Sequence, residues 1–580
     1  MSRYLKSETG TICKKWTDRV AIALLYPHVY GVAVSNLGYQ LVYALLNQRG
    51  DIVCERFVYP DGPEPLRSLE SNRPLSDFPL VMGSISFEQD YPRLAAMLAA
   101  GGIVPLATER AETVGPGAPL VVLGGVAVFM NPEPLAAFAD LMVLGEAEAV
   151  LDELVEILLD CTGKARSRLV RTCGVLPGCY APGLYRFRYD TNGAVLAVEP
   201  EAGLPPRVRR VHVADMARAS HSTLFSPEAE LGMYMVELGR GCSRGCRFCA
   251  AGFIYRPPRL WSTEGVLAGL AKRPDQCDRV GLLGMEMAHE ETTSRIAAAL
   301  AAADCSLSFS SLRADRISQQ ILDLLAASHL KSVAIAADGC SERLRVLINK
   351  GLDESDLLDA AERLTAAGLF HLKVYVMIGL PTETRDDLDE LIGLVRRLRE
   401  RILPLGRRRG RVVELTLSIN CFVPKPWTPF QYCAFGGLSA DEAEREHSVR
   451  PALERLKTTI TYLRRRLGEI ANVQCKFDSP EQALQQAILA RADRRIAPAL
   501  LDIGCGRHSF KQALRRHRID PWQFAIRPRG RTERMCWEVV DHGIRPAYLW
   551  AEYERALAGR ATPACEPAVC RNCGVCHEPS

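Results

Sequence analysis

Between residues 233 and 423 the chain repeats one pattern, a short apolar run followed by a stretch with helical spacing. Six such runs occur, from MYMVELG at the start to VELTLSINCFV at the end, and a helical segment follows each of the first five. Apolar runs of this length, separated by helices, are typical of buried parallel strands. The region therefore predicts a partial barrel of six βα units, open on one side. In such barrels the chemistry lies at the carboxyl ends of the strands.

A shorter series of the same kind precedes the barrel pattern. The apolar runs Val20–Tyr26, Leu80–Ser86, Pro119–Gly125 and Asp140–Glu146 alternate with helical stretches such as YPRLAAMLAAGG. This predicts a doubly wound α/β domain. After it, the pair Asn192-Gly193 lies between two alternating runs, which is typical of a β-hairpin.

These patterns divide the chain into four expected regions. At 580 residues the chain is too long for one hydrophobic core, so several domains are expected. We expect the doubly wound domain in residues 1–163, a hairpin linker in 164–230, the barrel in 231–440, and a helical region with a Cys-rich tail in 441–580. SADEAEREHSVRPALERLKTTITYLRRRLGEI, in the last region, predicts one long amphipathic helix.

Composition narrows the classes of function and location. The N-terminus lacks an apolar signal region and no run of eighteen apolar residues occurs, so we expect a cytoplasmic protein without a membrane span. A net charge of +4 is nearly neutral and argues little for nucleic acid. Twenty cysteines without an export signal favour metal ligands or buried apolar residues over disulfides.

The loop after the first barrel strand reads ELGRGCSRGCRFCAAGF and holds Cys242, Cys246 and Cys249. Zinc in structural sites takes four ligands, usually in two separated pairs, so this spacing does not suit zinc. Three close thiolates suit one face of a [4Fe–4S] cluster and leave one iron free for a small chelating molecule. The alternative is three buried cysteines in a loop without metal.

This loop resembles the CxxxCxxC loop of the radical S-adenosylmethionine (SAM) superfamily, in which an aromatic residue also takes the place of Phe248. RGCSRGCRFCAAGFIYRPPR, SERLRVLINKG, VYVMIGLPTET, FVPKPWTPFQ and the Cys-rich tail follow the order of a largely uncharacterised family within it, whose N-terminal domain is B12-binding-like. The resemblance implies a [4Fe–4S] cluster on the three cysteines, reductive cleavage of SAM to methionine and a 5′-deoxyadenosyl radical, and a reductant such as flavodoxin or ferredoxin.

Further segments resemble the parts of this superfamily that contact SAM. GLLGMEM matches a Gly-Gly-Glu motif at Gly284 and Glu286, and SFSSLRAD supplies Ser310 and Arg313 for the carboxylate or ribose of SAM. In KVYVMIGLPTET, Gly379 lets the backbone approach the adenine ring. For SFSSLRAD an ordinary polar strand end remains an open alternative.

Two groups of residues in the first domain bear on whether it binds cobalamin. YPHVYG places His28 where a cobalt-ligating histidine would lie, but Tyr26 stands in place of the carboxylate that orients such an imidazole, so His28 is not expected to bind cobalt. Gly124, Gly125 and Gly145 resemble the loops that admit the cofactor in B12-type relatives. Two alternatives stay open: cobalamin binds without a protein ligand, or the domain has lost it.

The tail CEPAVCRNCGVC carries a second cysteine group, Cys565, Cys570, Cys573 and Cys576. Four thiols in twelve residues predict a metal site. The C-x2-C-x2-C spacing resembles ferredoxin ligation, which favours a second iron–sulfur cluster, with zinc as the alternative. LDIGCG imitates the glycine loop of SAM-dependent methyltransferases, but too little chain follows for that fold.

The sequence thus favours a radical SAM enzyme of unknown substrate. With cobalamin, the expected reaction is methyl transfer to an unactivated carbon. Without it, the alternative is modification of RNA or a peptide by hydrogen abstraction. The basic runs PLGRRRGR and LRRRLG are consistent with RNA as a substrate. Two further classes are a non-catalytic iron–sulfur carrier or sensor and a zinc-stapled RNA-binding module.

Overall fold

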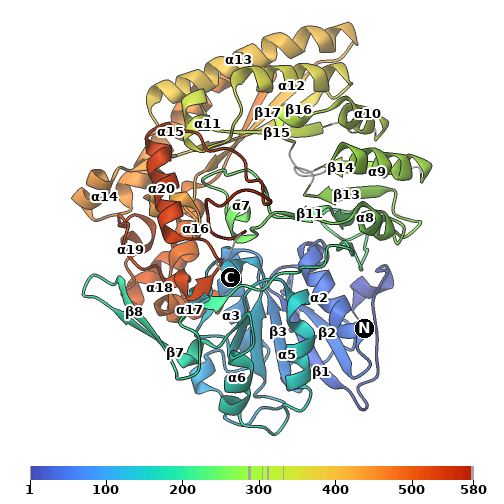
Figure 1. The fold of residues 1–580 in the computed structure, drawn as a ribbon, viewed down its shortest axis with the longest axis vertical. Coiled ribbons are helices and arrows are strands. Elements are labelled where there is room, and N and C mark those ends of the chain that lie inside the picture. Colours follow the sequence, from blue (N-terminus) through green and yellow to red (C-terminus); the bar gives the residue numbers. More distant parts are fainter. Residues whose placement is uncertain are drawn as a thin grey trace.

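The computed structural model describes residues 2–576, except 285–288, 304, 310, 311, 329 and 331. Two α/β units lie one above the other along the long axis, and the C-terminal region runs along both (Figure 1). Among the described residues, no helix has both the length and the apolar character needed to cross a membrane.

The lower unit is a six-stranded sheet in the order β2-β1-β3-β4-β5-β6. Its first five strands run parallel and β6 is antiparallel. The strands are β1 (Val20–Tyr26), β2 (Ile52–Val58), β3 (Leu80–Ser84), β4 (Leu120–Gly124), β5 (Leu141–Val143) and β6 (Cys179–Tyr180). The helices are α1 (Tyr30–Val34), α2 (Leu37–Gln48), α3 (Tyr91–Ala100), α4 (Val126–Met130), α5 (Leu151–Leu158) and α6 (Arg166–Gly174).

The predicted doubly wound sheet is confirmed, with two strands that the sequence did not reveal: β2, and the short β6, which lies beyond the predicted end of the domain at residue 163. β2 is buried along its whole length although it contains Glu55 and Arg56, which interrupt the apolar run. Arg56 is compensated by two buried carboxylates, with its Nη2 2.5 Å from Glu8 and its Nε 2.7 Å from Glu70. A buried charge with such partners is tolerated in a core strand.

The linker contains the predicted hairpin, formed by β7 (Tyr185–Tyr189) and β8 (Val195–Pro200) as an antiparallel pair. Gly193 adopts φ 80° in the turn, as a hairpin of this kind requires. A short strand that follows, β9 (Val208–Arg209), pairs in parallel with β19 (Val540–Asp541) of the C-terminal region.

The upper unit consists of two parallel sheets around a common interior. One contains β10 (Tyr234–Glu237), β13 (Arg279–Leu283) and β14 (Ser306–Phe309). The other contains β15 (Ser332–Asp338), β16 (His371–Ile378), β17 (Glu414–Cys421) and β18 (Val473–Phe477). A parallel bridge between Leu312 and Ile335 joins them, and in the described part of the chain no pairing of β10 with β18 closes the barrel.

All six predicted barrel strands are confirmed, and β18 is an unpredicted seventh. It pairs in parallel with β17 although it lies beyond residue 440, where the sequence places the end of the barrel. The outer helices are α8 (Thr263–Leu270), α9 (Glu290–Ala302), α10 (Gln319–Ala327), α11 (Glu342–Leu347), α12 (Glu354–Ala366) and α13 (Arg385–Arg408).

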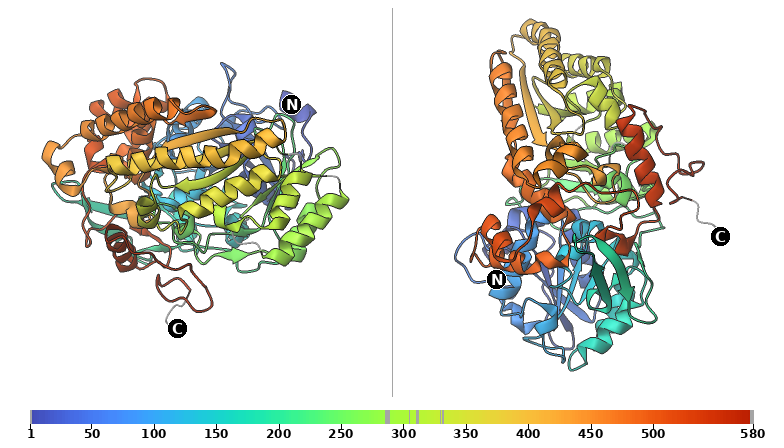
Figure 2. Two further views of the ribbon diagram at one scale, coloured as in Figure 1. Left: turned by 90° about the horizontal axis from the view of Figure 1, so that it is seen from above. Right: turned by 90° about the vertical axis from the view of Figure 1, so that its left-hand side faces the viewer.

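The C-terminal region connects the two units (Figure 2). The prediction of a single long helix from residue 439 onward was wrong. His447 adopts a left-handed conformation at φ 44° and separates α14 (Ala440–Glu446) from α15 (Arg450–Gly468). The remaining helices are α16 (Pro480–Arg491), α17 (Ala497–Gly504), α18 (Phe510–Arg516), α19 (Pro521–Ala525) and α20 (Pro546–Leu557). LDIGCG lies at the end of α17, which confirms that it is not a methyltransferase loop.

Candidate active site

The three cysteines lie on an excursion of the chain directly after β10. A short antiparallel pair, β11 (Gly239–Arg240) and β12 (Arg259–Leu260), forms the neck of this excursion, and α7 (Ala251–Ile254) lies within it. We call residues 241–258 the cluster loop. Gly241 is required at the neck because its φ is 88° and a Cβ atom there would lie 2.9 Å from the Tyr255 carbonyl oxygen.

Cys242, Cys246 and Cys249 line one cavity of about 490 Å³. The Arg244 amide donates to Cys242 Sγ at 3.4 Å, and the first amides of α7 donate to Cys249. Burial raises the pKa of Cys246 to about 12, so binding a metal must displace protons. Among the described residues no three Cys, His, Asp or Glu side chains are already arranged around one point as a metal site. The donor set, three thiols on one loop, fits a [4Fe–4S] cluster.

The same cavity is lined by polar residues from the carboxyl ends of several barrel strands. Asp338 ends β15, and its carboxylate lies 2.6 Å from Nζ of Lys350. Tyr375 of β16 and Asn420 of β17 complete the polar wall. Arg313 donates to the Gly351 carbonyl oxygen at 2.8 Å. A cation, an anion and an aromatic ring therefore face the thiols across one cavity.

A second cavity of about 410 Å³ lies between the two units, and we call it the interdomain cavity. The lower sheet contributes the ends of β3, β4 and β5, including Gly124, Gly125 and Gly145. The upper unit contributes Arg240 and Gly241. Most of the wall is apolar. The cluster loop and its neck thus separate this cavity from the one that contains the thiols.

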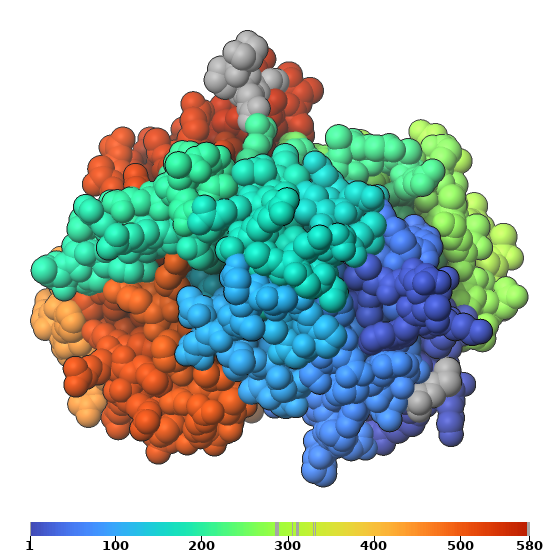
Figure 3. Space-filling model, turned by 90° about the horizontal axis from the view of Figure 1, so that it is seen from below, coloured from blue at the N-terminus to red at the C-terminus, as the bar shows by residue number. Residues whose placement is uncertain are grey.

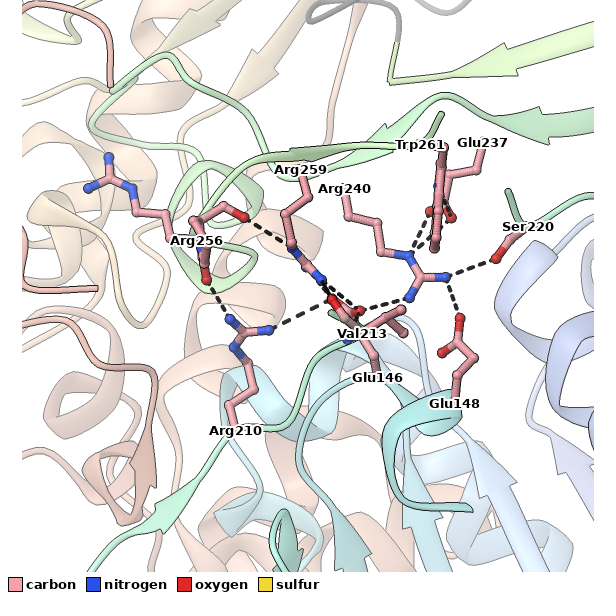
Figure 4. A network of polar contacts seen from close by, with 11 residues as sticks. Glu146, Glu148, Arg210, Val213, Ser220, Glu237, Arg240, Arg256, Arg259 and Trp261 are labelled. Atoms are coloured by element: carbon pink, nitrogen blue, oxygen red, sulfur yellow. Dashed lines mark hydrogen bonds and ion pairs between the residues drawn. The ribbon is translucent and has the colours of Figure 1, made fainter. Parts of the chain in front are cut away.

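Figure 4 shows a network of buried charges at the same boundary. Arg240 Nη1 lies 2.9 Å from Glu146 of the lower unit, its Nη2 lies 2.7 Å from Glu148, and its Nε lies 3.0 Å from Glu237 of β10. Arg259 binds the other oxygen of Glu146 at 2.5 Å. Hydrogen bonds and charges from these arginines hold the pKa of Glu146 at about 2 although burial opposes this. We call these five residues the hub.

Comparison with known families decides the superfamily. The family described as "Radical SAM proteins, N-terminal" matches residues 38–182, and the family described as "Radical SAM superfamily" matches residues 236–395. The chain belongs to the radical SAM superfamily. It is accordingly an enzyme, its barrel is a radical SAM core, and membership of the superfamily implies a [4Fe–4S] cluster and SAM.

Individual relatives of this radical SAM enzyme are distant. An uncharacterised protein of Methanocaldococcus jannaschii is 25% identical over 504 residues, which cover 86% of this chain and 94% of that protein. The methyltransferase TsrM of Kitasatospora setae is 14% identical with a TM-score of 0.48, covering 86% of this chain and 99% of that one. The cobalamin-dependent enzyme OxsB is 16% identical with a TM-score of 0.44, covering 65% of this chain and 52% of OxsB.

The predicted SAM residues do not all meet in the radical SAM core. Arg313 lines the cavity with the three cysteines. Gly284 packs against the neck of the cluster loop, where a Cβ atom would lie 2.9 Å from the Gly239 oxygen, and Gly379 packs against Leu456, where a Cβ atom would lie 2.7 Å from its side chain. Both therefore serve close packing. Glu286 and Ser310 lie outside the described residues.

Sequence reasoning missed Asp338, Lys350, Tyr375 and Asn420. Strand alternation could have found three of them: the residues of β15, β16 and β17 are alternately buried and half-buried, and Asp338, Tyr375 and Asn420 are in the half-buried rows near the strand ends. Lys350 lies in a loop after α11 and has no such signal.

Of the three glycines expected to admit cobalamin, backbone packing requires two and does not require the third. Gly125 has φ 104° with a Cβ position 2.5 Å from the Ile85 oxygen, and Gly145 has φ 132° with a Cβ position 2.0 Å from the Val211 oxygen. Backbone packing alone therefore requires glycine at both. Gly124 has no such constraint, since its Cβ position would meet only Val143 at 3.7 Å. His28 is not among the residues that line the interdomain cavity, and its Nδ1 accepts the Val29 amide.

The C-terminal segment holds the cluster loop from outside. Arg247 of the loop is buried and binds Glu552 of α20 at 3.2 Å, and it also donates to the Arg560 oxygen at 2.7 Å. The Cys565 amide donates to the Ser243 oxygen at 2.7 Å. We call residues 552–565 the strap, because it ties α20 and the tail to the loop that holds the three thiols.

The four tail cysteines gather next to the strap. The Cys565 thiol interacts with those of Cys570 and Cys576, and the Arg256 guanidinium interacts with Cys573. Burial raises the pKa of Cys565 to about 12. The grouping and the positive charge of Arg256 suit a metal-bound set of thiolates.

Proposed function

We propose that this enzyme cleaves SAM at a [4Fe–4S] cluster held by Cys242, Cys246 and Cys249. When bound, the cluster supplies the electron and the open coordination position for the amino and carboxylate groups of SAM. The observation that supports this is the shared cavity: three thiols and the polar ends of successive barrel strands line one space.

The chain's own residues suit the charges of SAM. Lys350 and Arg313 are placed to bind its carboxylate, and Asp338 to bind its ammonium group. The Lys350–Asp338 pair keeps both charges satisfied before SAM arrives. Tyr375 offers an aromatic surface for the adenine ring.

Replacement of Cys246 tests this proposal. Cys246→Ala removes one of three ligands, so the reconstituted protein is expected to lose the iron of this site and SAM cleavage, measured as 5′-deoxyadenosine release. Cys475→Ala, which removes a thiol from β18, serves as the matched control and is expected to keep both. SAM cleavage that survives in Cys246→Ala contradicts the proposal.

We further propose that the interdomain cavity binds cobalamin, which makes methyl transfer the reaction. The support is its position at the carboxyl ends of the parallel strands, where doubly wound sheets bind ligands, and directly against the cluster loop. Since His28 does not line it, the cofactor would bind without a protein ligand to cobalt. Titration with hydroxocobalamin followed by desalting tests this: retention near one per chain supports it, and no retention rejects it. Hydrogen abstraction from RNA or a peptide is then the alternative.

We also propose that the tail cysteines hold a second iron–sulfur cluster, with zinc as the alternative metal. Pairwise interactions link the four thiols, and the strap, which ends at Cys565, connects them to the cluster loop. A one-electron reductant such as flavodoxin or ferredoxin is the expected partner for either cluster. Iron and zinc content, measured with and without these cysteines, distinguishes the two metals.

A further inference from the structure

Two buried arginines of the C-terminal region have no carboxylate partner. Arg491, the last residue of α16, is 1% exposed, and Arg529, in the loop after α19, is 7% exposed. Throughout the described part of the chain, no carboxylate lies within ion-pair distance of either side chain. Burial and repulsion by Arg529 lower the pKa of Arg491. Since a guanidinium stays protonated in proteins, these two charges need an anion nearby.

Backbone carbonyl groups and thiols do not supply this anion. Both arginines donate to carbonyl oxygens at the end of α19, those of Ala525 and Phe524. The end of a helix carries only about half an elementary charge, against two whole charges here. Burial raises the pKa of the neighbouring Cys433 thiol, so this thiol stays neutral. Nε of Arg491 is buried and has no hydrogen-bond partner among the described residues, so this donor remains for a ligand.

The two buried arginines line a cavity of about 30 Å³. Its walls come from the end of α16, the segment 523–537 and the tip of hairpin β7–β8, which Figure 3 shows beside the C-terminal helices. Four arginines and two carboxylates line the cavity, and both carboxylates already have partners. Asp493 lies 2.6 Å from Arg495, and Glu533 binds Arg527. The wall of the cavity therefore has an excess of positive charge.

We propose that this cavity binds a chloride ion on the guanidinium groups of Arg491 and Arg529. Size limits the ligand: a water molecule needs ~10–15 Å³ of such space, so a cavity of about 30 Å³ admits a monatomic anion but not a phosphate ester. Water alone would fill the space but leave both charges without compensation. The cavity shares no residue with the one that contains the three thiols, so binding there does not depend on the proposed cleavage of SAM.

Thermal unfolding of the full chain tests this, in mixtures of sodium chloride and sodium gluconate at constant ionic strength. The Tm of the parent should rise by about 3 °C between zero and about 150 mM chloride, and level off as the site fills. Arg491→Met removes one charge from the cavity, so its Tm should shift by less than about 1 °C over the same range. Bromide should replace chloride in the parent, whereas gluconate is too large to enter.

Arg494→Met is the matched control, because this half-buried arginine of the same region binds Glu133 at 2.7 Å and does not line the cavity. It should keep the chloride response of the parent, although the loss of an ion pair lowers its Tm. No response in the parent, an equal response in the parent and Arg491→Met, or loss of the response in both variants overturns the proposal. If Arg491→Met does not fold, crystals of the parent grown in bromide decide. An anomalous peak beside Arg491 and Arg529 supports the site, and its absence overturns it.

Discussion

Arg240, two residues before Cys242, connects three carboxylates from two segments of the chain, Glu146 and Glu148 of the lower unit and Glu237 of β10. Arg240→Lys can satisfy only one of them, so buried carboxylates lose their partner and the free energy of unfolding is expected to fall by about 3 kcal/mol. Because the neck of the cluster loop loses its anchor, we also expect the rate of SAM cleavage to fall about tenfold.

Arg259→Lys is the control for this change, because Arg259 binds the same Glu146 from the far side of the neck. It should destabilise the protein comparably but leave SAM cleavage within about threefold. If both variants lose cleavage equally, Arg240 acts only by holding the two units together. Denaturant unfolding and 5′-deoxyadenosine release measure the two effects.

Glu383 makes the stability of the protein depend on pH. Burial raises its pKa to about 7, while its carboxylate accepts the Gly379 amide. Its contribution to stability is therefore complete below about pH 4.5 and is lost as the pH rises through 7. Relative to Glu383→Gln, which does not titrate, the parent should lose on the order of 3 kcal/mol between pH 5 and pH 8. Denaturant unfolding at several pH values checks this, and parallel pH curves would contradict it.

At the scale of elements, the strap gives the sharpest prediction. A chain that ends at Gly559 lacks the contacts of Arg560, Thr562 and Cys565 with the cluster loop. We expect its SAM cleavage to fall about tenfold because the loop is held less firmly. Cleavage equal to that of the full chain would show that the strap has no such role.

The replacement of all four tail cysteines by serine separates the strap from its metal. This variant keeps the backbone of the strap and should keep SAM cleavage. Its iron content should drop from about eight to about four atoms per chain if the tail holds a [4Fe–4S] cluster. Loss of one zinc with unchanged iron would assign zinc instead.

Most strands and helices were predictable because their apolar residues follow a regular pattern. The strands that were missed lack such a pattern. The four apolar runs of the lower sheet were found because burial on both faces requires continuous apolar residues. Barrel strands such as β15, β16 and β17 were found because every second residue is a buried apolar one. β2 was missed because Arg56 is neutralised by Glu8 and Glu70, which are distant in sequence. β18 was missed because VQCKF is only half-buried and lies between two helices.

The site was predictable where chemistry is encoded locally. Cysteine spacing singled out the loop whose three thiols line one cavity, since all three come from one short segment. Asp338 and Lys350 could not be paired from sequence, because the bend of the chain after β15 brings them together. The contacts of the hub could not be predicted from sequence either, because Glu146 and Arg240 belong to different units.

At the scale of the whole molecule, both units line the interdomain cavity, so a ligand there would contact both. Gly124→Phe should place a ring in the space lined by this residue without backbone strain, since a Cβ atom there meets only ordinary contacts. If the cavity binds cobalamin, this variant should retain less than about a tenth of the corrinoid of the parent. Visible absorbance after desalting measures it.

Gly62→Phe provides the control, because a side chain at Gly62 of the lower unit meets no atom within 4 Å. It should retain corrinoid as the parent does. Equal retention by the Gly62 and Gly124 variants would place the cofactor elsewhere or show that its binding is non-specific.

The strap also sets an order of events during synthesis. The three thiols lie near residue 245, whereas the residues that close over their loop, 552–565, leave the ribosome only after the whole radical SAM core. Until the strap is synthesised, the loop is therefore accessible to the machinery that delivers iron and sulfide. Docking of the strap closes this access, so a centre assembled earlier is sealed in place by the last turn of α20 and the start of the tail.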